Sequence, residues 1–197
     1  MDIKAAINKL PKSCDEITLG LYLDYSRELS TLKDDEYTTM KGQLAMFNIV
    51  EMFLGANPGD LDDILIEDMN QLTDRVAKLI TEAKEFKPSD HFVLNDITYS
   101  TRKIADMNQL SAGEYISIGT LKEHYINDQL SLIPYILAIL IRPASLVKDE
   151  ETKKERWVQE PFNQRDIDNL EYRVKLFKEK ALAKDLVPVC RFFLSGK

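Results

Sequence analysis

The chain has little of what several protein classes require. Cysteine occurs only as Cys14 and Cys190 in 197 residues, too few for a disulfide framework or a zinc module. Seven glycines and seven prolines are too few for a low-complexity or collagen-like protein. With 26 basic and 33 acidic residues, the net charge of −7 disfavours a dedicated nucleic-acid coat, which needs a basic face.

Long hydrophobic runs are also missing. The longest, residues 132–141, is well short of the roughly 20 residues that cross a bilayer, and it contains Pro134. This run predicts a buried helix, with Pro134 early enough to be tolerated in its first turn. Residues 1–7 lack the apolar core of a signal peptide, so we expect synthesis in the cytoplasm with both thiols free.

What is present is an ordinary globular composition, 44% hydrophobic and 30% charged, with apolar residues spaced three and four apart. This pattern predicts a mainly α fold. The expected helix starts are residue 3, Thr18, residues 34–36, Asp60, Ser111, Asp128 and Asp166, with a last apolar segment from Pro188. The third helix carries an apolar stripe at these spacings, made of Met40, Leu44, Phe47, Val50 and Leu54.

One segment has a different pattern. Phe92 to Leu94 and Ile97 to Tyr99 flank Asn95 and Asp96, which tolerate the left-handed backbone of a tight turn. We therefore expect one short β-hairpin packed against the helices. The mixed charges of residues 148–156 predict a solvated loop instead.

The chain is expected to form a compact helical domain with two halves, residues 1–87 and 88–197. A weak internal repeat relates ITLGLYL at residues 17–23 to LSAGEYI at residues 110–116. Each copy precedes a strongly apolar helix. Either the halves are related helical pairs, or capped amphipathic helices simply look alike.

The sequence contains few residues in the patterns typical of catalytic or metal-binding sites. His91 and His124 are far apart in the chain, and neither cysteine has a neighbouring histidine to act as a base. The acidic cluster of residues 60–68 lacks the central glycine of a calcium loop and contains an apolar tripeptide instead. Basic residues in the charged segment 148–156 alternate with acidic ones, and the mixed signs cancel the field that would attract a nucleic acid. We expect no enzyme activity, no cofactor, no metal and no sequence-specific nucleic-acid binding.

Four motifs from residue 92 onward resemble a recurring pattern in small structural-module proteins of tailed bacteriophages, above all crAss-like phages and others that infect Bacteroidetes. They are FVLNDITY (residues 92–99), SAGEYI (111–116), ILAILIRP (136–143) and RFFLSG (191–196). The order and spacing of the motifs carry the resemblance more than any one of them does.

The resemblance implies a role in virion morphogenesis. The expected function is that of a virion-associated protein, structural or cargo-like, in the capsid or tail lumen or at the portal–tail region. Its partners would be portal, tail or packaged proteins, with many copies per particle. The alternatives are a tail-assembly chaperone absent from the mature virion, and a small enzyme or host-directed effector delivered with it.

Aromatic side chains are the candidate contacts for such partners, because each buries a large apolar area at low entropic cost. The candidate interaction residues are Tyr115, Tyr125, Tyr135, Trp157, Phe162, Phe192 and Phe193. Each of them either contacts a partner or belongs to the core.

Overall fold

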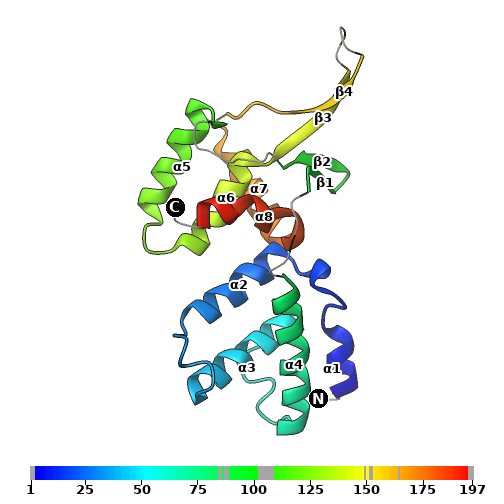
Figure 1. Ribbon diagram of the computed structural model, residues 1–197, viewed down its shortest axis with the longest axis vertical. Coiled ribbons are helices and arrows are strands. Elements are labelled where there is room, and N and C mark those ends of the chain that lie inside the picture. Colours follow the sequence, from blue (N-terminus) through cyan, green and yellow to red (C-terminus); the bar gives the residue numbers. More distant parts are fainter. Residues whose placement is uncertain are drawn as a thin grey trace. The chain divides into compact units, whose positions relative to one another are not determined.

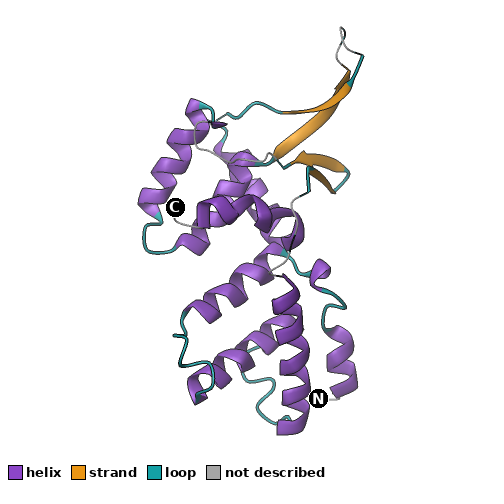
Figure 2. Ribbon diagram, in the orientation of Figure 1, coloured by secondary structure: helices purple, strands orange, loops and turns teal. Residues whose placement is uncertain are grey.

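The computed structural model describes residues 3–83, 86, 89–101, 109–148, 150, 153–163 and 165–194, with side chains through residue 189. Helices make up 59% of the chain, and its described strands form one antiparallel sheet (Figure 2). The predicted mainly α fold is confirmed. The chain divides into two compact units, Met1–Glu85 and Phe86–Lys197 (Figure 1). Residues 87 and 88, between which the sequence predicts the boundary of the two halves, lie outside the described part.

The first unit is helical. Its elements are α1 (Ile3–Lys9), a short 3₁₀ helix η1 (Cys14–Glu16), α2 (Leu19–Ser30), α3 (Met40–Leu54) and α4 (Ile66–Ala83). Thr18 caps α2 as predicted, its hydroxyl accepting from the Leu21 N–H at 3.3 Å. The core lies between α2, α3 and α4, where Tyr25 packs against Phe53 with ring centroids 5.7 Å apart.

Two predicted helix starts in this unit are wrong. Residues 34–36 do not open α3, because the Glu36 carboxylate accepts from the Lys33 N–H at 2.9 Å and closes a turn there. The cap of α3 is Thr39. Asp60 does not cap α4, because its carboxylate accepts from the Asn57 N–H at 2.8 Å. Acidic side chains accept hydrogen bonds from backbone N–H groups in turns as readily as at helix starts, and here they do so in turns.

The second unit combines helices with the sheet. Its elements are β1 (His91–Leu94), β2 (Ile97–Ser100), α5 (Ala112–His124), α6 (Gln129–Leu140), β3 (Arg142–Lys148), β4 (Glu155–Gln159), α7 (Ile167–Lys180) and α8 (Ala183–Leu194). The strand order is β1-β2-β3-β4.

The predicted hairpin is present as β1 and β2. Phe92 pairs with Tyr99, and the turn residues Asn95 and Asp96 have φ values of 51° and 62°. These left-handed conformations match the right-handed twist of the strands, as in a type I′ turn. Phe92 and Tyr99 also stack on each other and pack against Phe177 of α7, so the hairpin contributes to the core of its unit.

The prediction of a solvated loop at residues 148–156 is wrong at both ends. Lys148 is the last residue of β3, and Glu155 and Arg156 begin β4. The two strands pair over five positions, from Ala144 opposite Gln159 to Lys148 opposite Glu155. Charged residues on a hairpin that projects from its unit are compatible with strand pairing, because both faces meet solvent.

Helix α6 is the central helix of this unit, as its all-round apolar sequence predicts. Every residue from Ile136 to Ile141 is buried, and α5, α7 and α8 pack around it. Pro134 is the sixth residue of α6, so its predicted place in the first turn is wrong. The last apolar segment, expected from Pro188, is part of α8, which begins earlier, at Ala183.

The two segments of the proposed repeat have matching local structure. Thr18 and Ser111 each cap a helix through the hydroxyl, and in each unit the capped helix packs against the apolar helix that follows it. Both interpretations of the repeat, related helical pairs and capped amphipathic helices that look alike, predict this arrangement.

Candidate functional site

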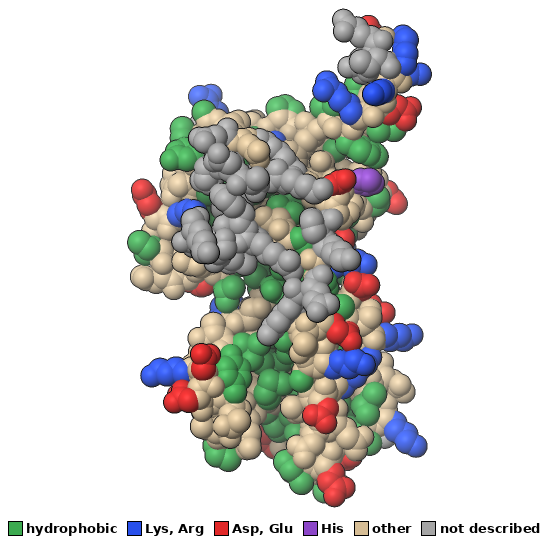
Figure 3. Space-filling model, in the orientation of Figure 1, with side chains coloured by type: hydrophobic (Ala, Val, Ile, Leu, Met, Phe, Trp, Pro, Cys, Tyr) green, Lys and Arg blue, Asp and Glu red, His purple; other side chains and the backbone are tan. Residues whose placement is uncertain are grey.

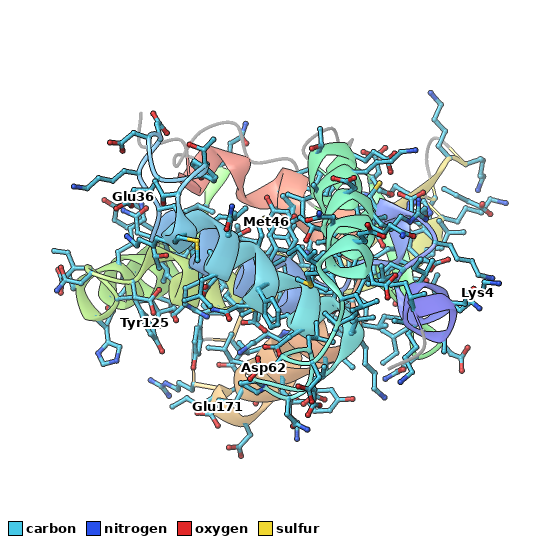
Figure 4. The ribbon with its side chains drawn as sticks, turned by 90° about the horizontal axis from the view of Figure 1, so that it is seen from below. Lys4, Glu36, Met46, Asp62, Tyr125 and Glu171 are labelled. Atoms are coloured by element: carbon cyan, nitrogen blue, oxygen red, sulfur yellow. The ribbon has the colours of Figure 1, made fainter. Side chains whose placement is uncertain are left out.

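The first unit carries an apolar groove between the start of α3 and the start of α4. Its volume is about 680 Å³. The apolar side chains that line it are Tyr37, Met40, Leu44, Met46, Phe47, Ile66 and Met69. In Figure 3 hydrophobic side chains gather over these two helices, and Figure 4 labels Met46 on α3 and Asp62 on the segment before α4.

The groove exists because α3 is apolar on two faces. In the apolar stripe identified from the sequence, Met40 and Leu44 are 80% and 62% exposed and face the groove. Val50 of the same stripe is buried, and Ala45, Ile49 and Phe53 from another face of α3 fill the rest of the core. An amphipathic pattern identifies apolar stripes, but which stripe is buried depends on what packs against the helix.

One wall of the groove is the turn that carries Tyr37, and Gly42 holds that turn close to α3. A Cβ atom at Gly42 would lie 2.5 Å from the carbonyl oxygens of Glu36 and Tyr37, so no larger residue fits. The Lys33 N–H and the Lys41 ammonium group both bond the Glu36 carboxylate and lower its pKa. The turn is thus fixed by several local contacts.

The second candidate surface is the β3–β4 hairpin, which extends from the helices of its unit (Figure 1). Leu146 and Trp157 face each other across the strands, and they are 50% and 40% exposed. Val147 and Val158 lie on the opposite face with 43% and 40% exposure. A two-stranded hairpin with apolar residues on both faces is marginally stable alone, so its base must be well anchored.

Arg142, the first residue of β3, provides that anchor. Its guanidinium donates to Glu114 Oε1 at 2.6 Å, to the Glu160 carbonyl at 2.7 Å, to Gln159 Oε1 at 3.0 Å and to the Ile139 carbonyl. The side chains of Arg142 and Glu114 are only 8% and 1% exposed. A buried ion pair needs this many hydrogen bonds, because water no longer solvates its charges.

Gln159 of β4 extends the network to the rest of the sheet. Its amide nitrogen donates to the Ser100 carbonyl at 3.1 Å and to the Leu140 carbonyl at 2.7 Å. Together with Arg142 it connects α6, β2, β3 and β4. The Phe162 ring lies against the guanidinium, with the Arg142 Cζ atom 5.7 Å from its centroid.

Glu114 completes the network from α5. Its second oxygen accepts from the Ser111 N–H at 2.7 Å, while the Ser111 hydroxyl accepts from the Glu114 N–H, which makes a capping box. Burial raises the pKa of Glu114, but the bonds from Ser111 and Arg142 outweigh burial and lower it. Glu114 is not among the candidate residues predicted from the sequence, although the Ser-x-x-Glu spacing that starts at the predicted Ser111 cap is a signal for it.

The candidate aromatic residues occupy several places in the second unit. Tyr115 is 55% exposed on α5, and Trp157 is 40% exposed on β4 with its ring 5.4 Å from that of His91. Tyr125 and Tyr135 are half-buried side by side, and a hydrogen bond between them raises the pKa of Tyr125 to about 12. Phe162 is half-buried beside Arg142.

Phe192 and Phe193 belong to α8, but their side chains lie outside the described residues. The structure therefore brings together Tyr125 with Tyr135, while Tyr115, Trp157 and Phe162 each lie among other neighbours.

For the described residues, no group of three or more His, Cys, Asp or Glu side chains is placed to hold a metal ion. Within the same part of the chain, no helix is both long enough and apolar enough to cross a membrane. No family model, curated protein or solved structure matches this chain.

Proposed function

We propose that this chain is a non-enzymatic, virion-associated protein of a tailed bacteriophage, which works by binding other phage proteins. The observation that carries the proposal is the groove between α3 and α4. It leaves Met40, Leu44 and Ile66 at least 62% exposed beside one another, and exposed apolar surfaces of this kind are typical of protein-binding sites.

The shape and chemistry of the groove favour a helical partner segment. Three methionines, Met40, Met46 and Met69, line it, and their flexible side chains adapt to the apolar face of a docked helix. The four motifs that resemble phage structural proteins supply the virion context. The expected partner is an amphipathic segment of a portal, tail or packaged protein.

Mass spectrometry of purified particles tests the virion assignment. We expect the protein at many copies per particle. Detection only in the lysate of infected cells would contradict the proposal and favour the tail-assembly chaperone. Absence from both would remove the phage assignment altogether.

Substitution in the groove tests the mode of binding. Leu44→Ser should abolish incorporation into particles while the thermal unfolding temperature stays near that of the natural protein, since Leu44 is exposed. The matched control is Met52→Ser, an exposed apolar residue of the same helix that does not line the groove. Equal incorporation of both variants would show that the groove is not the binding site.

A further inference from the structure

Strand β4 is an edge of the sheet among the strands that the structure describes. The Glu160 N–H donates to the Pro143 carbonyl at 2.8 Å, so Glu160 occupies a hydrogen-bonded position opposite β3. In an antiparallel pair such positions alternate along each strand. Even-numbered residues of β4 therefore bond to β3. The backbone N–H and C=O groups of Glu155, Trp157 and Gln159 point the other way, to the open edge.

We propose that a second copy of this chain pairs with this edge, β4 against β4 in antiparallel orientation, with Trp157 opposite its counterpart. The outward residues lie symmetrically about Trp157, so in this register Glu155 of each copy meets Gln159 of the other. Every outward N–H and C=O of the strand then has a partner, as a two-fold interface requires.

Neighbouring registers are worse. A pairing centred on Arg156 would place Gln159 opposite Lys153, whose φ of 56° is incompatible with a strand. A pairing centred on Val158 would place Glu155 opposite Pro161, which has no N–H to donate. The symmetric register about Trp157 is the one that avoids both defects.

Side chains support the same register. It places Lys154 of each copy opposite Glu160 of the other, so two oppositely charged pairs form across the interface. On one face of the joined sheet, Trp157 lies beside its counterpart, and Leu146 flanks it on each side. The exposed apolar residues of that face thus become a continuous row, which a single hairpin cannot provide.

Sedimentation equilibrium of the purified full chain tests the proposal, independently of any virion role. We expect a monomer–dimer equilibrium that depends on protein concentration. Lys154→Glu and Glu160→Lys should each raise the dimer dissociation constant about tenfold, because both attractive pairs become repulsive. The double variant exchanges the charges and should restore the dimer.

A backbone variant tests the edge itself. Glu155→Pro removes one outward N–H without removing a bond to β3, whereas the control Glu155→Thr keeps that N–H. We expect the proline variant to weaken the dimer and to retain the circular dichroism spectrum of the natural protein.

Three results would overturn the proposal. A monomer at every accessible concentration would show that the edge does not bind a second copy, and would direct attention to an extended segment of another protein. A dimer that none of these variants weakens would place the interface elsewhere. Failure of the double variant to restore the dimer would refute the register.

Discussion

The buried pair of Glu114 and Arg142 gives the sharpest test of how the second unit is held together. Replacing Glu114 by glutamine keeps the shape of the side chain and removes its charge. The guanidinium of Arg142 then stays in a site where it is only 8% exposed, without a counter-charge. Replacing Arg142 by methionine leaves the opposite charge stranded, on a carboxylate that is only 1% exposed.

The expected magnitudes follow from these exposures. Removing one partner of a buried ion pair costs about 3–5 kcal/mol. Glu114→Gln should fall near 3 kcal/mol, because the amide oxygen still accepts one of the two hydrogen bonds. Arg142→Met should cost about 4–5 kcal/mol, since the Glu160 and Ile139 carbonyls also lose their donor. The double variant strands no charge, so we expect a coupling free energy of about 2–3 kcal/mol.

Urea denaturation followed by tryptophan fluorescence measures these values. Trp157 is the sole tryptophan and lies on β4, two residues from Gln159 of the network, so the signal reports this unit. Glu28→Gln is the matched control, because Glu28 accepts a hydrogen bond from Asn48 in the other unit. A coupling free energy below about 0.5 kcal/mol would refute the role of the buried pair.

Three further predictions concern the same unit. Because the pKa of Glu114 is lowered in the folded state, its contribution to stability is present above the unfolded pKa of about 4.3 and is lost as pH falls through the folded value. In acid denaturation, the free energy of unfolding of Glu114→Gln should therefore fall less steeply over this pH range than that of the natural protein. Asp96→Val should destabilise the β1–β2 hairpin by about 1–2 kcal/mol, since φ is 62° there, whereas Asp96→Gly should not, and thermal unfolding distinguishes them. Leu137→Ala should cost about 2–5 kcal/mol in urea, because Leu137 is fully buried, whereas the exposed Ile116→Ala should cost less than about 0.5 kcal/mol; equal losses would contradict the assignment of α6 to the core.

Features fixed by nearby residues were predictable from the sequence. The hydroxyl and carboxylate caps at Thr18, Ser111, Asp128 and Asp166 each bond a backbone N–H three residues ahead. The turn of the β1–β2 hairpin depends on two adjacent residues that tolerate positive φ. In both cases the residues that determine the structure are neighbours in the chain.

Features that depend on distant partners were missed. The strands β3 and β4 have charged residues at their far ends, and only their pairing with each other shows that they are strands. The stripe of α3 that is buried depends on α2 and α4, which the periodicity of α3 cannot reveal. The groove has the same origin, because the apolar stripe that α2 and α4 leave uncovered lines it. The spacing of its residues alone does not distinguish this stripe from a buried one.

The polar network involves three of the four sequence motifs, those at or next to residues 92–99, 111–116 and 136–143. Glu114 comes from the motif after the Ser111 cap, and Arg142 comes from the Arg-Pro motif, 28 residues further along. Ser100, whose carbonyl accepts from Gln159, directly follows the hairpin motif. Two of the motifs thus supply the buried ion pair itself, and the hairpin motif directly precedes the backbone carbonyl that Gln159 joins to the same network. Proteins that share these motifs should therefore share the anchored hairpin as well. Their edge strands are then the place to look for the same pairing between copies.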